Sequence, residues 1–554
     1  MRKHSGTIAA LLDGRRLLLL ATAAAVLLFV GYPLFQLFLK SLPIDNYLAQ
    51  LRNPQSLRAL LNTLYVSVGI TLLATSVGSV FAFYMIRTDL PLKRFVRSGI
   101  YLLFLTPAYV GGMAWIQLFG RAGYLTRWIK MTFGIVRPPW DLYTLEGVIL
   151  VMGLNMIPIA YMATANALRN ADPSREEASI MSGSSTLRTL RRVTLPLALP
   201  GILAGAFLVF VHGVSGFGVP ALLAMPSGHL VLTTQIYAAL GHYDVRMACA
   251  LSIFLIAITA LALWIHNAIL RRNRYDVSAN PARSIATYSL GRWRWPAAAL
   301  ILVFLLLFAV GPLVMICLSS LLKAWGLPIA WGNLSLGNYR SIFSVGVSAR
   351  ALRNSFLFAA GGATCASVLG LAVAYIVHRT RLRSRRLLDF LATAPLAVPG
   401  PVVAAAMIFA WTNPVLRLYN TPWIILVAYT AAFLPYAVRT ISGVLEGMQA
   451  SLEEAGWLSG GTWARVFADV VFPMVRRGAW AGWMLVFLMA FREIPISTML
   501  YTQGTETVGV LMFILKTEAG GLEVVSAVAV VVLLLTAIGQ IAVSRLAGVR
   551  KGIL

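Results

Sequence analysis

Long apolar segments separated by short polar ones run along the whole 554-residue chain. A helix that spans a membrane needs about 20 mostly apolar residues. The pattern predicts twelve such helices, at residues 17–39, 61–86, 98–119, 145–167, 199–224, 246–270, 294–321, 354–378, 387–411, 421–444, 478–500 and 523–546. The first follows Arg15 and Arg16 as a signal peptide would, but it has no small-residue cleavage site, so we interpret it as a retained span. The prediction is an all-α polytopic membrane protein.

Composition agrees with this fold class. Apolar residues make up 59% of the chain and charged residues 12%, whereas soluble domains average roughly 45–50% and about 25%. A soluble enzyme and a disordered chain are both excluded. The three cysteines lie in or beside apolar segments, without the spacing of a metal or redox site.

The net charge of +27 would suit a nucleic-acid partner, but the basic residues lie in short runs between apolar segments. With the N-terminus in the cytoplasm, the predicted cytoplasmic segments hold 31 Lys and Arg and the external ones 14. This is the distribution of the positive-inside rule. We therefore expect both termini in the cytoplasm, the lipid bilayer as surroundings, and no nucleic-acid partner.

The sequence also contains an internal repeat. Residues 58–107 align onto 350–399 at an offset of 292, and residues 158–201 align onto 435–478 at an offset of 277. Six predicted spans separate the equivalents, so the two halves have the same orientation and form parallel six-helix repeats. We expect a first half at 1–270, a cytoplasmic linker at 271–293 and a second half at 294–554. The matched Pro158 and Pro435 should kink their spans, as a moving pore or a static bend requires.

Each half has one long predicted cytoplasmic loop, at 172–198 and 449–475. Ser174 with Glu177, and Ser451 with Glu454, have the spacing of a helix capping box. Gly183 and Gly460 should end these short helices. Ser185 and Thr462 should then cap second helices that run to Pro196 and Pro473. Each loop is predicted as a helix, a glycine turn and a helix; an amphipathic hairpin without a partner would explain one such loop but not two.

These loops resemble the EAA loop of permease subunits of binding-protein-dependent ATP-binding-cassette (ABC) importers, with its pattern E-A-A-x3-G-x9-I-x-L-P. The first copy departs at Ser179 and Val193, and the second at Gly456, Val470 and Phe472. In that family the loop docks into the ATPase subunit. The resemblance covers roughly 58–270 and 350–546 and implies an ATPase-coupling role for Glu176, Glu177, Ala178, Gly183, Pro196, Glu453, Glu454, Ala455, Gly460 and Pro473.

The resemblance further implies a fused permease that supplies both halves of one pore in a bacterial inner (cell) membrane. Its partners would be ABC ATPase subunits, expected as a homodimer, and an extracytoplasmic substrate-binding protein. The chain has no G-x-x-x-x-G-K-[ST] phosphate loop, so we expect a separate subunit to hydrolyse ATP. The sequence shows no catalytic constellation and no metal-ligand spacing, so neither an enzyme nor a cofactor is predicted.

One charged pair, Arg492 with Glu493, lies inside a predicted span. Charges at that depth are usually functional or face a wet cavity. The alternatives are a role in the pathway or its gate and a mutually neutralised structural pair. The equivalent residues of the first half are Ser215 and Gly216, so the pair breaks the repeat symmetry.

For the substrate, residues 492–501 and 216–223 look most like ferric iron permeases. We therefore predict ferric iron, with a phosphonate or thiamine as alternatives. A twelve-span secondary transporter is the competing class, but residues 87–97 lack the G-x-x-x-D-R pattern expected there.

Overall fold

A computed structural model of the chain describes residues 17–272, 288–344, 346–380, 382–412, 416–516 and 521–546. Within these ranges the chain forms helices and loops, with isolated β-bridges as the extended pairing. Nine helices of the described ranges are long and apolar enough to cross a membrane, or eleven if each sharply bent pair is one span. The all-α polytopic fold class is confirmed, while a count of twelve spans is not.

The first half begins with the helix Leu17–Ser41, whose last part is α2. Its α-helices are α2 (Tyr32–Ser41), α3 (Asp45–Arg52), α4 (Pro54–Arg87), α5 (Lys93–Leu105), α6 (Ala108–Phe119), α7 (Tyr124–Phe133), α8 (Leu145–Asn170), α9 (Ser174–Met181), α10 (Thr186–Thr189), α11 (Leu195–Ser215), α12 (Gly218–Leu223), α13 (Leu232–Gly241) and α14 (Val245–Arg272). Those of the second half are α15 (Arg294–Leu305), α16 (Gly311–Leu321), α17 (Gly337–Ser344), α18 (Gly346–Arg379), α19 (Arg385–Thr393), α20 (Gly400–Trp411), α21 (Pro422–Glu446), α22 (Ser451–Leu458), α23 (Trp463–Val466), α24 (Phe472–Phe491), α25 (Pro495–Leu500), α26 (Val508–Ile514) and α27 (Leu522–Leu546).

The internal repeat is visible in the helix bounds. Helices α4 and α18 are both 34 residues long and lie 292 positions apart. Their packing is also equivalent, because α4 contacts α8 and α18 contacts α21. A Cβ on Gly78 would lie 2.8 Å from the Ala160 Cβ, and one on Gly370 would lie 2.9 Å from the Ala437 Cβ. These glycines therefore allow the close approach of helices that small residues provide in membranes.

The predicted spans 98–119 and 387–411 are not straight helices. Helix α5 bends by 103° into the helical segment 108–133, and residues 385–397 bend by 116° into α20. Pro107 and Pro399 follow the bends. A proline disfavours helical backbone in the residue before it, and Thr106 and Val398 are extended with ψ of 114° and 117°. Hydropathy alone could not reveal the change of direction.

The predicted spans 199–224 and 478–500 also need correction. Helix α11 ends at Ser215 and α24 at Phe491, and a short helix follows each, α12 and α25. The backbone leaves the helix at the glycine Gly216, with ψ of 126°. The apolar character continues through both breaks, so the sequence pattern could not show them.

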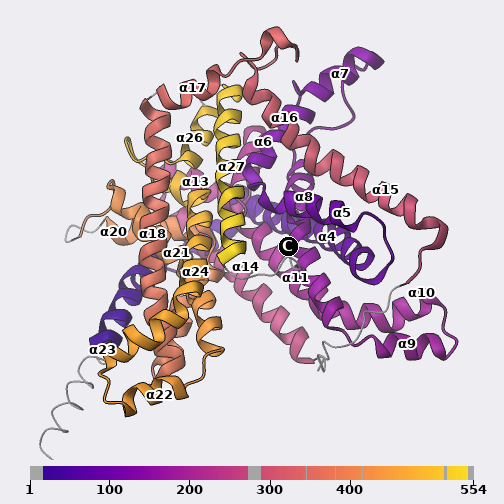
Figure 1. The fold of residues 1–554 in the computed structure, drawn as a ribbon. Helices are drawn as coiled ribbons and strands as arrows, with labels where there is room; N and C mark the ends of the chain where they lie inside the picture. Colours follow the sequence, from indigo (N-terminus) through magenta and orange to yellow (C-terminus); the bar gives the residue numbers. More distant parts are fainter. Residues whose placement is uncertain are drawn as a thin grey trace, which may run out of the picture.

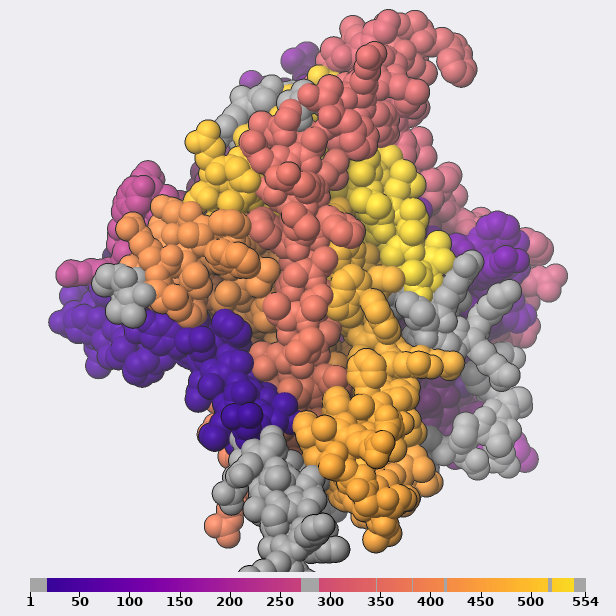
Figure 2. Space-filling model, turned by 60° about the vertical axis from the view of Figure 1, so that its left-hand side comes forward, coloured from indigo at the N-terminus to yellow at the C-terminus, as the bar shows by residue number. Residues whose placement is uncertain are grey.

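The first helix of each half packs across both halves. Helix α2 contacts α20 of the second half as well as α14, and α16 contacts α6 of the first half as well as α27. The Tyr32 hydroxyl donates to the Ala410 carbonyl at 3.4 Å, and the Trp115 and Phe308 rings stack at 5.7 Å. In Figure 2 the indigo N-terminal helix lies against the orange segment of the second half. The two halves are thus interlocked.

Candidate functional site

The two loops that resemble EAA loops lie at the same end of the molecule. Figure 1 shows α9 with α10, and α22 with α23, at the bottom, while α7 and α17 lie at the opposite end. Each loop contains an eight-residue helix, a turn and a second helix. The predicted helix, turn and helix are therefore present in both copies.

A buried ion pair anchors each loop to the last residue of the longest helix of its half. In the first half Arg87 Nε lies 3.4 Å from Glu176 Oε1, with both side chains fully buried. In the second half Arg379 Nε lies 2.8 Å from Glu453 Oε1. Burial raises the pKa of the Glu176 carboxyl above its ordinary value, and the Arg87 guanidinium offsets part of that rise. Glu176 and Glu453 therefore face the interior of the protein, where each holds its loop to the arginine that ends the long helix.

The second-half anchor has further polar contacts. Arg379 Nη2 donates to the carbonyls of Leu445 and Met448 at 3.0 and 2.8 Å. The Tyr375 hydroxyl donates to Glu453 Oε2 at 3.3 Å and accepts from Trp463 Nε1 at 3.1 Å. The arginine therefore joins α18, the end of α21 and α22 in one network.

The first half completes its anchor with a residue from outside the half. The position equivalent to Tyr375 is Phe83, which lacks a hydroxyl and stacks on Tyr288 at 6.1 Å. The Tyr288 amide donates to the Arg87 carbonyl at 2.7 Å, and its hydroxyl lies 3.2 Å from the Thr194 hydroxyl. Of the predicted linker 271–293, residues 273–287 lie outside the described ranges, but Tyr288 shows that its end docks beside the first loop.

The predicted capping boxes are wrong. No side-chain cap is present at Pro173 or Ala450, the residues that precede α9 and α22. The Ser174 amide instead donates to Asp172 Oδ1 at 3.0 Å, so an upstream carboxylate satisfies a donor at the helix start. Glu177 and Glu454 are exposed rather than folded back onto the backbone.

The predicted glycine turns are confirmed. Gly183 and Gly460 have φ of 80° and 82°, a left-handed conformation that glycine adopts without strain. The Ser184 amide donates to the Ser179 carbonyl at 3.1 Å, and the Gly461 amide donates to the Gly456 carbonyl at 3.1 Å. These bonds end the short helices as a C-terminal glycine motif does.

The second helix of each loop does not stop at its proline. It passes through a π-helical turn, Leu190–Thr194 or Phe467–Val471, and continues as α11 or α24 with Pro196 and Pro473 at the second position. A proline has no N–H to donate to the helical hydrogen-bond pattern, and each π turn ends directly before the turn of helix that holds the proline. Of the two predicted caps, Thr462 accepts from the Arg465 amide at 3.4 Å, whereas the Ser185 side chain makes no cap bond.

The tips of the loops expose apolar side chains that the sequence analysis did not select. Met181 is 88% exposed and Leu458 is 89% exposed, at positions 277 residues apart. Ala178 and Ala455, three positions earlier in the chain, are also exposed. Pro196 and Pro473 are exposed as well. An apolar residue two positions before each turn glycine was the available signal. Each loop therefore offers an apolar tip on a rigidly anchored helix.

The second feature is a cavity of about 350 Å³ between the halves. Its lining includes equivalent pairs of residues from the two repeats, namely Pro107 with Pro399, Met156 with Phe433, Ser215 with Arg492, and Gly216 with Glu493. Helices α8 and α11 of the first half face α20, α21 and α24 of the second. A pseudo-symmetric cavity at this place is suited to a translocation pathway.

Arg492 and Glu493 line the cavity without forming an ion pair with each other. Glu493 Oε1 accepts from the Ile496 amide at 2.6 Å, and Oε2 accepts from the Ser497 amide at 2.9 Å. The carboxylate thus caps the start of α25, and the alternative of a mutually neutralised pair is not what the structure shows. Pro158 and Pro435 lie buried within the continuous helices α8 and α21, and the described lining of the cavity includes neither.

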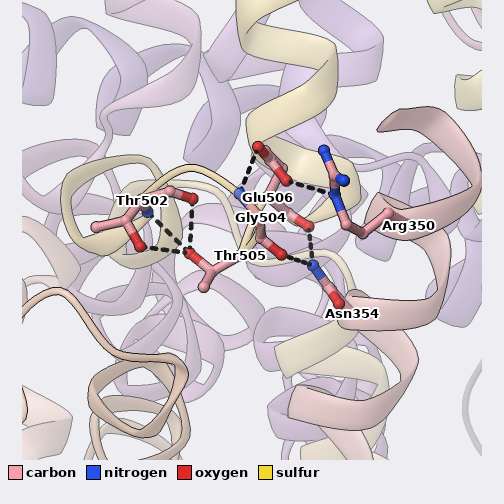
Figure 3. A network of polar contacts seen from close by, with 6 residues as sticks. All are labelled: Arg350, Asn354, Thr502, Gly504, Thr505 and Glu506. Carbon is pink, nitrogen blue, oxygen red and sulfur yellow. Dashed lines mark hydrogen bonds and ion pairs between the residues drawn. The ribbon is translucent and has the colours of Figure 1, made fainter. Parts of the chain in front are cut away.

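At the end opposite the loops, a polar network fixes the segment between α25 and α26 to α18 (Figure 3). Asn354 donates to the carbonyls of Gly504 and Glu506 at 2.9 and 3.0 Å, and Arg350 Nε lies 3.2 Å from Glu506 Oε2. The first half has a counterpart, since Asn62 donates to the Leu230 carbonyl at 2.8 Å. Both halves therefore tie the loop behind the short helix to their longest helix.

Comparison with known proteins places these features in a family. The family described as "binding-protein-dependent transport system inner membrane component" matches residues 74–275 and 366–548. A Haemophilus influenzae protein named for ferric transport, FbpB 1, is 26% identical over 88% of this chain and 78% of its own length. FbpB of Actinobacillus pleuropneumoniae, also named for ferric transport, is 25% identical over 88% of this chain and 72% of its own length.

A Salmonella typhimurium protein named for 2-aminoethylphosphonate transport, PhnU, is 28% identical over 36% of this chain and 71% of its own length. The family itself matches once in each half, and the two matches together cover more than half of the chain. The chain therefore belongs to the family of inner membrane components of binding-protein-dependent transport systems, and it is a fused permease that carries both halves in one polypeptide.

Proposed function

We propose that the chain forms the whole pore of an ATP-driven importer and that its two loops, 172–198 and 449–475, dock ATPase subunits. The observation that carries this proposal is the matched pair of loops at one end, each anchored by a buried Arg–Glu pair and each exposing an apolar tip. A short helix held in this way transmits force to the long helix behind it. Two equivalent loops suit two identical ATPase subunits.

This assignment orients the molecule. The end with the loops faces the cytoplasm, in agreement with the excess of Lys and Arg in the predicted cytoplasmic segments. The end with α7 and α17 then receives substrate from an extracytoplasmic binding protein. Both chain termini lie on the cytoplasmic side, and residues 1–270 and 294–554 supply the two halves of the pore.

The cavity is the proposed pathway, with Arg492 and Glu493 in its wall and with Pro158 and Pro435 in the helices that move around it. Cysteine pairs across the cavity, for example at positions 156 and 433, test this motion. They should cross-link to different extents with and without nucleotide trapped in the ATPase. Equal cross-linking in both states would indicate a static scaffold.

The proposed substrate is ferric iron. The support is the similarity over 88% of the chain to relatives named for ferric transport and the pore-facing stretch that begins at Arg492. A phosphonate is the second candidate, because the relative named for phosphonate transport matches 36% of the chain at 28% identity.

The deciding experiment compares uptake of radiolabelled ferric iron in a deletion strain with and without the gene. ATPase co-purification with the tagged permease is measured in parallel. We expect iron uptake only in the complemented strain. Unchanged iron uptake together with lost growth on a phosphonate would reject iron and favour the second candidate.

A further inference from the structure

The cavity contains a cation without an acidic partner. The ion pairs formed by the described residues do not include Arg492, although its side chain lines the cavity. The neighbouring Glu493 also lines the cavity but does not pair with Arg492, because its two oxygens are held at the start of α25 by the Ile496 and Ser497 amides. The positive charge of Arg492 is therefore directed at the contents of the cavity.

The rest of the wall is mainly apolar. Met152, Met156, Val403 and Phe433 contribute to it. Besides Arg492 and Glu493, its polar side chains are Tyr109, His212, Ser215 and Tyr436. A charge in such surroundings is costly unless a counter-charge approaches. The symmetry-related position holds Ser215, so the charge is present on one side of the pathway alone. The cavity wall thus presents one positively charged side chain to which an anion could bind.

A bare ferric ion does not suit this cavity. Like charges repel more strongly where water is scarce, and ferric iron carries three charges of the same sign as Arg492. A hard cation also needs several oxygen ligands. Within the described ranges there is no group of three His, Cys, Asp or Glu that could hold a metal, and the Glu493 oxygens are already engaged.

We propose that Arg492 binds an anion in this cavity, and that iron crosses this permease as a negatively charged complex with small oxyanions, such as carboxylates or phosphate. The inference about iron rests on the proposed function above. A volume of about 350 Å³ lies near the lower end of small-molecule sites, which range over about 300–1,000 Å³. A single ferric ion with a few small oxyanion ligands is of that scale.

The test uses the complete importer in liposomes, with this permease, its ATPase and its binding protein. The binding protein is loaded with ⁵⁵Fe and either [¹⁴C]citrate or [³²P]phosphate, and ATP-dependent entry of both labels is measured. Arg492→Gln removes the charge and Arg492→Lys keeps it. Arg439→Gln is the matched control, because Arg439 pairs at 3.4 Å with Asp389 outside the cavity. Co-purification of the ATPase checks that each variant is folded.

We expect one of the two anion labels to enter in a fixed ratio to iron in the unmodified permease. Arg492→Gln should reduce the entry of iron and of that anion by roughly 30-fold or more. Arg492→Lys and Arg439→Gln should retain transport. The double variant Ser215→Arg/Arg492→Gln, which moves the charge to the equivalent position, should recover part of the uptake.

Entry of iron without citrate or phosphate, or unchanged iron uptake by Arg492→Gln, would overturn the inference while leaving the ferric function in place. If phosphate or citrate instead enters without iron, and Arg492→Gln blocks that entry, the ferric function is wrong and the anion site stands. The two proposals can therefore fail separately.

Discussion

Arg379 Nε and Glu453 Oε1 lie 2.8 Å apart and join the last residue of α18 to the inward face of α22. Arg87 and Glu176 form the equivalent contact in the first half. The first pair is fully buried, and in the second pair Arg379 is 11% exposed and Glu453 3% exposed, so both pairs are largely shielded from water. The ion pairs therefore fix the loops to α4 and α18, the helices that pack against the cavity-lining helices α8 and α21.

The first prediction concerns this anchor. Replacing Arg379 by Ala leaves the Glu453 carboxylate buried without its cation, which should destabilise the loop by about 3–5 kcal/mol. Limited proteolysis of the purified permease should show faster cleavage within 449–475, with less ATPase bound. Arg465→Ala is the control, because its pair with Asp469 is exposed and should contribute at most about 1 kcal/mol. Similar cleavage of the two variants would contradict the anchoring role.

The second prediction concerns the glycine turns. Gly183→Ala and Gly460→Ala place a Cβ on backbone with φ of 80° and 82°, at a cost of about 1–2 kcal/mol each. We expect the double variant to insert normally but to bind less ATPase and transport less substrate. Gly443→Ala is the matched control, since Gly443 lies within α21 with no atom near the added Cβ. Full transport by the double variant would mean that the turn shape is irrelevant to docking.

The third prediction concerns the apolar tips. Met181→Ser and Leu458→Ser should leave the thermal stability of the isolated permease unchanged, because both side chains are exposed. Docking should weaken by about 2 kcal/mol per site, as for a central apolar contact of an interface. Titration of the detergent-solubilised permease with ATPase measures this loss. Met131→Ser, at an 83% exposed residue of α7, should bind ATPase normally. An equal loss there would mean that any exposed methionine replaced by serine weakens binding, and that the loop tips have no special role.

The fourth prediction is a pH dependence of the first anchor. Burial already raises the pKa of Glu176, and Arg87→Met should raise it further by removing the compensating charge. The variant's loop should therefore lose stability as the pH rises from the ordinary glutamate pKa of about 4.3 to the raised value, and stay weak above it.

Proteolysis of the loop 172–198 at about pH 5 and about pH 8 measures this loss across the titration range of the carboxyl. Cleavage of Arg87→Met should be faster at the higher pH. The double variant Arg87→Met/Glu176→Gln has no carboxyl to ionise and should be cleaved at similar rates at both. A pH dependence that persists in the double variant would show that another group titrates.

Local patterns predicted much of this structure. The offsets of 292 and 277 recur in the bounds of α4 and α18 and of α9 and α22, because the same residues at the same spacing form the same helices. The glycine turns were predictable for the same reason. The change in direction of the chain was not predictable, since the bends before Pro107 and Pro399 lie within segments that are apolar enough to be taken for single spans.

The candidate sites could likewise be predicted from the sequence only in part. Two adjacent glutamates stand in each loop, and the sequence cannot say which one faces inward, because that depends on how α9 and α22 are rotated against Arg87 and Arg379. The lack of an ion pair between Arg492 and Glu493 likewise follows from the break after α24. That break gives the carboxylate the amides of α25 instead.

The interlocked first helices impose a delay on biosynthesis. Tyr32 bonds to the carbonyl of Ala410, a residue 378 positions later in the chain. At roughly 5–20 residues per second, a ribosome needs about 20–75 s to reach that partner after Tyr32 is made. During this interval the N-terminal helix must remain in the lipid bilayer with its α20-facing side uncovered. Assembly of the first half is therefore completed only when nearly half of the second half has been synthesised.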